Sequence, residues 1–163
     1  VFTAVNKLYW MSLKDKQPKQ LTSMKVTEAM PTWRPNGKEI AFVSWNEKEG
    51  GHVYKLRLDK KAAPVKLTQE AGVYTQPAWS NDNRIVVFKG AAQQFKDADG
   101  PRAFQQKSSL VWLNTARPGK STLITKARGL SNPHFAQEDN RIYLNSSDGL
   151  ISLRWDGTDQ KKS

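Results

Sequence analysis

A short pattern of residues occurs three times in this chain of 163 residues. Each copy places a proline two residues before an aromatic residue, continues with a polar turn and then an apolar run. The prolines, Pro31, Pro77 and Pro133, are 46 and 56 residues apart. A repeat of this length is typical of propellers and solenoids, in which each unit buries its apolar surface against its neighbours. The repeat therefore constrains the fold before any single motif does.

Each copy has the features of a hairpin. The aromatic residues Trp33, Trp79 and Phe135 precede turns that contain Asn-Gly or Asp-Asn, and an apolar strand follows each turn. A third, alternating strand comes next, and in the first two copies a short fourth strand ends in Leu-Thr or Ile-Thr. Four antiparallel strands per repeat predict the blade of a β-propeller. We expect the three aromatic residues to pack between neighbouring blades.

The predicted fold class is all-β, a partial β-propeller with four-stranded antiparallel blades, two complete and two incomplete. We assign residues 31–68 and 77–125 to the complete blades. Residues 1–22 fit a blade that is entered one strand late, and residues 133–159 fit a blade that stops after its third strand. Residues 1–163 would then be a fragment of one propeller domain.

The incomplete blades leave two ways to arrange the ends of the chain. A closed propeller usually has about four to eight complete blades. Either strands from both ends share one blade and close a very small ring, or the chain is a piece of a longer protein. We favour the longer protein, since the sequence starts without Met or a signal peptide. An open ring exposes strand edges, so self-association through the end blades is also expected.

Composition restricts the partners. The chain has no cysteine, which excludes disulfides and thiolate metal sites, and no apolar stretch long enough for a transmembrane helix. Lys and Arg number 26 against 15 Asp and Glu, for a net charge of +11. These basic residues are scattered over the predicted turns, without a recognition helix or an aromatic-basic stacking motif. We therefore predict no nucleic-acid partner.

The repeated motif resembles that of the TolB-like propeller family, in which Pro-x-Trp, a Ser-Pro-Asp-Gly-like turn, an apolar strand and a terminal Leu-Thr recur in each blade. The third copy departs from this turn at residues 136–140 but keeps an Asp-Asn pair. Residues 128–135 and 150–159, together with the insertion 89–107, are also similar to the N-terminal propeller of exported bacterial amidohydrolase-related proteins. These resemblances imply a periplasmic or extracellular bacterial protein.

Catalytic motifs are missing from the sequence. A binuclear amidohydrolase centre needs a His-x-His strand with further His and Asp ligands, whereas this chain has only His52 and His134, far apart. A Gly-x-Ser-x-Gly nucleophile elbow and glycine-rich phosphate loops are also absent. We therefore predict no catalytic residue, metal site or cofactor within these residues. Whether the parent protein is an enzyme stays open, and the resemblance implies a metal-dependent amidohydrolase.

His134 is the most informative candidate for binding. It takes the repeat position of Thr32 and Ala78, next to the aromatic residue, on the strand expected to line the central channel. One interpretation is a polar contact at the channel mouth. The alternative is a structural histidine whose ring is satisfied by neighbouring backbone groups.

The other candidates lie in an insertion at residues 89–107, between the second and third strands of the third repeat. Insertions in repeat proteins collect on one face and often make contacts with partners. Phe95 and Phe104 are apolar residues in this polar loop, and Arg102 lies between them. We predict that Phe95, Phe104 and Arg102 contribute to an interaction surface.

The sequence thus predicts a non-catalytic propeller module for protein interaction or substrate gating, within a larger exported amidohydrolase-like protein. Its partners would be other domains of that protein or envelope proteins. One alternative is a free-standing periplasmic scaffold of the TolB type that binds envelope proteins. Another is the gating propeller of a prolyl-oligopeptidase-like peptidase. The flanking gene sequence would separate these three hypotheses.

Overall fold

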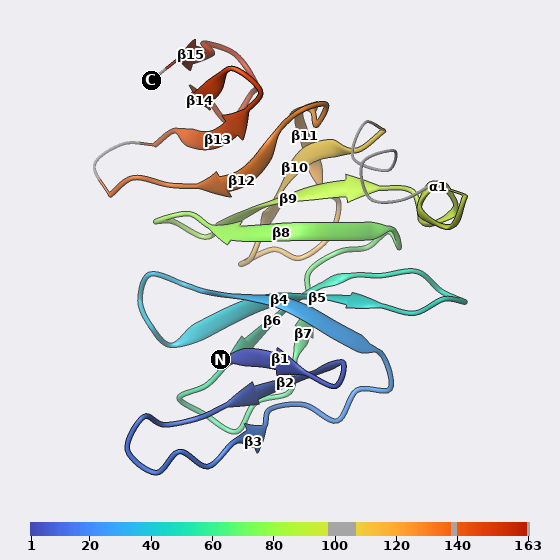
Figure 1. The fold of residues 1–163 in the computed structure, drawn as a ribbon, viewed down its shortest axis with the longest axis vertical. Coiled ribbons are helices and arrows are strands. Elements are labelled where there is room, and N and C mark those ends of the chain that lie inside the picture. Colours follow the sequence, from blue (N-terminus) through green and yellow to red (C-terminus); the bar gives the residue numbers. More distant parts are fainter. Residues whose placement is uncertain (98–106, 138–139, 163) are drawn as a thin grey trace.

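The computed structural model describes residues 1–97, 107–137 and 140–162 (Figure 1). These residues form four antiparallel sheets that follow one another along the chain and are arranged side by side. A five-residue helix, α1 (Ala92–Lys96), follows the second strand of the third sheet. The fold is all-β, and each sheet is a propeller blade, which confirms the predicted fold class.

Within each blade the strands pair in chain order. The first blade contains β1 (Phe2–Ala4), β2 (Lys7–Trp10) and β3 (Lys19–Gln20). The second contains β4 (Thr27–Trp33), β5 (Glu39–Trp45), β6 (Val53–Arg57) and β7 (Val65–Lys66). The third contains β8 (Val73–Trp79), β9 (Arg84–Gly90), β10 (Ser109–Asn114) and β11 (Thr122–Lys126). The fourth contains β12 (Ser131–His134), β13 (Ile142–Ser146), β14 (Gly149–Leu153) and β15 (Lys161–Lys162).

The fourth blade corrects one expectation, because it has four strands where the sequence predicted three. Its outer strand β15 pairs with β14 through Lys161 opposite Ser152 and Lys162 opposite Ile151. Both lysines are exposed, so no apolar alternation marks this strand in the sequence. Only its backbone pairing defines it. The inner strands β4 and β8 also begin before the prolines at which the blades were expected to start.

The core lies between the blades, because the second strand of each central blade is buried on both faces. In β5, Ile40 and Phe42 pack in the cluster shared with the first blade, whereas Ala41 and Val43 pack against the third blade. Successive side chains of a strand point to opposite faces, which explains this division. The second strand of the third blade, β9, divides in the same way between the second and fourth blades. The continuous apolar runs in the sequence are therefore strands with two buried faces.

A buried carboxylate connects the first blade to the second. Glu28 in β4 is fully buried, and its carboxylate accepts hydrogen bonds from the Leu8 amide at 3.1 Å and from the Thr22 hydroxyl. The Lys7 ammonium is 3.8 Å from the same carboxylate. A buried charge is tolerated only when it is paired and hydrogen-bonded in this manner. Glu28 therefore adds a buried polar contact beside the apolar cluster at this blade interface.

The first and fourth blades lie at opposite ends of the row of sheets (Figure 1). In the described ranges 1–97, 107–137 and 140–162, no strand pairing joins β1, β2 or β3 to the strands of the fourth blade. The shared blade that would close a very small ring is therefore not formed in this structure.

Candidate binding groove on the inner strands

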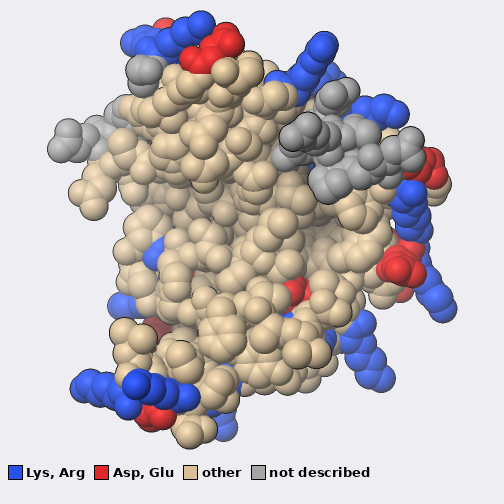
Figure 2. Space-filling model, viewed as in Figure 1, with Lys and Arg blue, Asp and Glu red and all other residues tan. Residues whose placement is uncertain are grey.

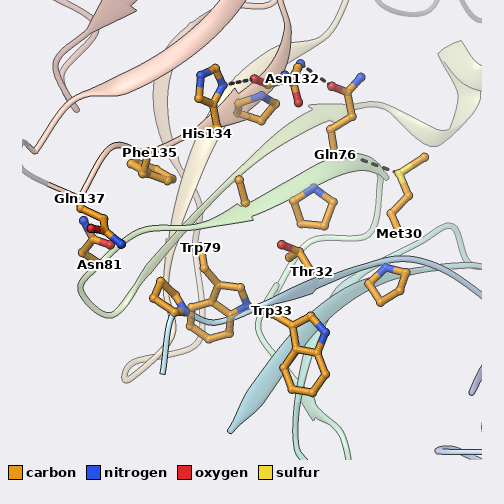
Figure 3. Close-up of a pocket in the computed structure, with 15 residues that line it drawn as sticks. Met30, Thr32, Trp33, Gln76, Trp79, Asn81, Asn132, His134, Phe135 and Gln137 are labelled. Carbon is orange, nitrogen blue, oxygen red and sulfur yellow. Dashed lines mark hydrogen bonds between the residues drawn. The ribbon is translucent and has the colours of Figure 1, made fainter. Parts of the chain in front are cut away.

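A groove of about 690 Å³ crosses the inner strands of three blades (Figure 3). Its walls come from β4, β8 and β12 and from the turns that follow these strands. Apart from His134, the lining side chains are apolar or uncharged polar groups. The lining residues are Met30, Pro31, Thr32, Trp33, Pro35, Gln76, Pro77, Ala78, Trp79, Asn81, Asn132, Pro133, His134, Phe135 and Gln137.

The repeat places the same backbone irregularity in all three groove strands. Met30, Gln76 and Asn132, each directly before the repeat proline, have φ angles of 53°, 52° and 51°. The register of each strand shifts at this point, as expected for a β-bulge. A residue before proline avoids the right-handed helical region, and the left-handed conformation is unusual for residues other than glycine. The proline also removes an amide donor from the strand edge, so this edge cannot extend a sheet regularly.

The residues before the prolines connect the blades. The Gln76 amide donates to Met30 Sδ at 3.2 Å, and the Asn132 amide donates to Gln76 Oε1 at 2.6 Å (Figure 3). Each amide therefore receives its acceptor from the preceding inner strand. A thioether sulfur is a weaker acceptor than an amide oxygen, so the second of these contacts is the stronger. The sequence did not predict this ladder of hydrogen bonds between the inner strands, although the position before each repeat proline can be recognised in the sequence.

His134 lines the groove and also satisfies one ring nitrogen locally. Its Nδ1 is 2.8 Å from the Asn132 carbonyl oxygen, and its ring lies 5.7 Å from that of Tyr143. A carbonyl only accepts, so Nδ1 is the donor, and in the neutral ring Nε2 is left as an acceptor. The side chain is half-buried. The geometry therefore contains features of both interpretations, and a binding role for His134 stays a prediction.

The three repeat aromatic residues differ in burial, which corrects the expectation that all pack equally between blades. Trp79 is 5% exposed in the core between the second and third blades, with the Arg34 guanidinium 5.3 Å from its ring centre. Phe135 is half-buried and stacks on Trp155 at 5.4 Å. Trp33 is 43% exposed. Among the described residues, the sheet of the first blade consists of β1, β2 and β3.

The insertion lies away from the groove. Phe95 on α1 is 42% exposed, and its ring makes an edge contact with Trp45 of the second blade at 5.2 Å. In Figure 1, α1 lies at the end of the third blade opposite to the end of β8 that carries Trp79. Phe95 and His134 are therefore not brought together. Arg102 and Phe104 lie outside the described residues, so their predicted roles stay predictions.

Among the groups whose pKa values are shifted by burial, His52 and Tyr74 lie on the second and third blades, outside the groove. Burial and then the charge of Lys66 lower the pKa of His52, whose Nδ1 is 2.9 Å from Thr68 Oγ1. Burial and then the charge of Glu70 raise the pKa of Tyr74 to about 12. The Tyr74 hydroxyl donates to the Glu70 carbonyl at 2.8 Å. Both groups are uncharged near neutral pH, as expected for structural roles.

Charged residues lie around the groove. Arg34 reaches Asn83 of the next blade at 2.6 Å, and the Arg84 guanidinium lies 3.7 Å from the Trp155 ring centre in the fourth blade. On the face shown in Figure 2, lysines and arginines project mainly from the periphery. Within the described part of the chain, no group of three or more His, Asp or Glu residues is placed to hold a metal ion. No helix in that part is long and apolar enough to cross a membrane.

Comparison with known proteins supports the fold at low sequence identity. No family model matches the sequence, and no curated protein matches it either. Among solved structures, TolB from Acinetobacter baumannii aligns with a TM-score of 0.70 at 17% identity, over 96% of this chain and 37% of that chain. A putative TolB from Agrobacterium tumefaciens aligns with a TM-score of 0.69 at 18% identity, over 98% and 55%. The fold is that of a TolB-like propeller.

A prolyl endopeptidase structure aligns with a TM-score of 0.59 at 15% identity, over 95% of this chain and 25% of that chain. The chain therefore spans about a third to a half of the TolB structures and a quarter of the peptidase. At these identities the comparisons show the fold, and they do not show a resemblance to amidohydrolase-related proteins in particular.

Proposed function

We propose that this chain is a binding module of a TolB-like propeller that holds an uncharged, extended segment of a partner protein in the groove on its inner strands. The observation that carries this proposal is the composition of the groove. Three blades each contribute a proline, a residue with an exposed or half-buried polar or thioether group, and an aromatic residue. The repeat thereby builds one continuous surface rather than three separate ones.

The chemistry of the lining favours a peptide over a charged ligand. Proline and tryptophan faces, such as those of Pro31 and Trp33, provide apolar contact area for side chains. Amide side chains, such as those of Asn81 and Gln137, can donate to and accept from a peptide backbone. A highly charged ligand would have to lose its hydration without gaining an opposite charge, because no Asp, Glu, Lys or Arg side chain lines the groove.

The strand edges determine how such a segment would bind. The prolines and the bulges interrupt the inner strands, so the segment cannot simply extend a sheet by backbone pairing. Recognition would depend instead on side chains, with His134 Nε2 as one acceptor in the groove. A donor group on the partner, such as a hydroxyl or an amide, would meet it.

The setting of the module is part of the proposal. We infer that it belongs to a larger exported bacterial protein with an envelope location, since TolB structures share its fold and extend well beyond its length. A linked amidohydrolase domain stays a prediction. Reading the flanking gene tests it, because a downstream His-x-His strand motif is expected for the amidohydrolase and is not expected for a free-standing scaffold.

A gating propeller in a peptidase is the second candidate. The alignment with a prolyl endopeptidase favours it, since the matched fold occurs in that protein. A flanking hydrolase domain with a serine nucleophile elbow would select this candidate. The groove would then face the catalytic domain of the same chain rather than a separate protein.

Selection of peptides from a displayed library, followed by affinity measurements on the strongest peptide, tests the binding function. His134→Ala and Asn81→Ala are each expected to weaken the binding of that peptide by about fivefold or more, because the loss of one hydrogen bond costs about 1 kcal/mol. Leu123→Ala is the control, because Leu123 is 57% exposed in β11 and does not line the groove. Equal affinity in all three variants would contradict the proposed site.

A further inference from the structure

The groove contains a buried hydrogen-bond donor that has no partner. Trp79 lines the groove and is only 5% exposed. Its indole nitrogen, Nε1, is buried and makes no hydrogen bond within the described part of the chain. In Figure 3 this nitrogen is on the edge of the ring that is turned toward Trp33, another residue of the groove wall. An indole nitrogen only donates, so an acceptor brought by a ligand would complete it.

The tryptophan at the next blade interface has the partner that Trp79 lacks. Trp155 in the fourth blade is half-buried, and its Nε1 donates to Asn140 Oδ1 at 2.7 Å. Native proteins pair nearly all of their buried polar groups, so an exception requires an explanation. A buried donor without an acceptor destabilises the free protein, and a ligand that supplies the acceptor removes this cost. The unpaired nitrogen therefore indicates a ligand with an acceptor group.

The donor is fixed in position before a ligand binds. Trp79 packs in the cluster between the second and third blades, and both of these blades have all four strands. The Arg34 guanidinium lies 5.3 Å from the ring centre, and it is held by an ion pair with Glu39 and a hydrogen bond to Asn83. Such preorganisation reduces the entropy lost on binding. An acceptor reaches Nε1 when a lining side chain moves aside, and rotamer changes of this kind are common at binding surfaces.

The inner strands restrict the backbone chemistry of the ligand. Pro31, Pro77 and Pro133, with the bulges before them, interrupt the strands, so a bound segment cannot form a regular ladder with them. Each ordinary residue of that segment would bring an amide donor as well as a carbonyl acceptor, and both need partners when they are buried. A proline residue brings only the carbonyl. A proline-rich segment therefore supplies the acceptor for Trp79 and adds few donors that need partners.

The apolar lining suits the conformation of such a segment. Proline-rich segments adopt the polyproline II helix, which has about three residues per turn and no internal hydrogen bonds. Aromatic-lined grooves recognise this helix because it is already formed and loses little entropy on binding. The groove presents the rings of Trp79 and Phe135 beside the three repeat prolines. Its volume of about 690 Å³ lies within the range of about 300–1,000 Å³ that is usual for ligand sites.

We propose that the groove binds a proline-rich segment in the polyproline II conformation, and that Trp79 Nε1 donates a hydrogen bond to a backbone carbonyl directly before a proline. This inference rests on the proposed peptide-binding function and names the class of peptide. It also gives Trp79 a binding role in addition to its packing between blades. Because a proline-rich segment has few backbone donors, its binding depends on the donor of Trp79.

Labelled decaproline is the probe, and fluorescence anisotropy measures its binding to the full chain. Decaproline offers carbonyl acceptors and ring faces, and it has almost no amide donors. Saturable binding is expected. A glycine-serine peptide of the same length should bind more weakly by about tenfold or more, because it is flexible and lacks the rings.

A conservative substitution separates the donor from the packing of the ring. Trp79→Phe removes Nε1 but keeps an aromatic ring, and it should weaken decaproline binding by about fivefold or more. Trp112→Phe is the matched control, because Trp112 is half-buried between blades and does not line the groove. Its affinity should stay within about twofold of the original chain. Urea denaturation checks that both variants are folded.

Nuclear magnetic resonance of the ¹⁵N-labelled original chain observes the donor directly and remains a test if Trp79→Phe does not fold. The indole N–H signal of Trp79 is assigned by triple-resonance experiments. Saturation with decaproline should move its proton signal downfield, as expected for a new hydrogen bond. The indole signal of Trp112 should move much less.

The outcomes distinguish this inference from the groove function on which it rests. Absence of saturable decaproline binding, an unchanged affinity in Trp79→Phe, or an unmoved Trp79 signal at saturation would overturn the inference. If peptides selected from the displayed library still bind in the groove, the peptide-binding function stands and only the class of peptide is wrong. If those peptides do not bind there either, both proposals fail. Weaker decaproline binding in Trp79→Phe, with unchanged binding in Trp112→Phe, would support the inference.

Discussion

The interface between the second and third blades buries its repeat tryptophan, whereas the interface between the first and second blades leaves its own exposed. Trp79 is 5% exposed and Trp33 is 43% exposed, although each is paired with an isoleucine at the same register position, Ile85 and Ile40. The first interface has an apolar cluster around Leu8, Ile40 and Phe42 and also buries the carboxylate of Glu28. The same motif therefore contributes a different amount to the free energy of unfolding in each blade, and this amount depends on the packing of the neighbouring blade.

The largest expected effect tests this difference directly. Trp79→Ala should lower the free energy of unfolding by about 3–5 kcal/mol, because a large buried ring is removed from a packed core. Trp33→Ala should cost less than about 1 kcal/mol, since its ring is half in solvent. Urea denaturation of both variants measures the two values. Equal losses would show that the motif, and not the neighbouring blade, determines the contribution.

The next effect concerns the polar contact that connects the first blade. Glu28→Ala should cost about 1–3 kcal/mol, because the Leu8 amide and the Thr22 hydroxyl lose their buried acceptor. Glu47→Ala is the matched control, since Glu47 is exposed, and it should change stability by less than about 0.5 kcal/mol. Urea denaturation again provides the measurement. A Glu28→Ala chain as stable as the control would mean that this carboxylate does not hold the first blade.

The ladder between inner strands should contribute a smaller amount. Gln76→Leu removes the acceptor of the Asn132 amide and is expected to cost about 1 kcal/mol. Met30→Leu removes a weaker sulfur acceptor and should cost less. Thermal unfolding of the two variants compares them. A larger loss for Met30→Leu would contradict the order that the two contacts predict.

The smallest effect is a pH dependence from His52. Its pKa is lowered by burial and by Lys66, so the unfolded chain binds a proton at this site more readily than the folded chain. The contribution of His52 to stability is therefore constant above its unfolded pKa of about 6.5 and falls as the pH decreases below it. In the His52→Gln chain, the free energy of unfolding should therefore change less with pH between about pH 7 and pH 5 than in the original chain. Urea denaturation at several pH values in this range measures the change. The same pH dependence in both chains would contradict a contribution from His52.

The sequence predicted the strands that carry an apolar pattern or fit the repeat, and it missed β15. β5 and β9 were recognised from their apolar runs, whereas β15 consists of two exposed lysines and has no pattern that hydrophobicity could reveal. The candidate site was predicted only in part. His134 was chosen because a histidine stands where the other repeats have Thr32 and Ala78, whereas the hydrogen bonds of Gln76 and Asn132 between blades were not predicted.

What the sequence by itself determined is the repeat, and with it the blade, the strand order and the two buried faces of each central strand. These features follow from local periodicity and turn chemistry, which act within one blade. The tertiary structure alone decided which aromatic residues are covered and which amides receive an acceptor from the preceding strand. Burial and hydrogen bonding between blades depend on what the neighbouring blade presents, so equal motifs such as those of Trp33 and Trp79 reach unequal environments.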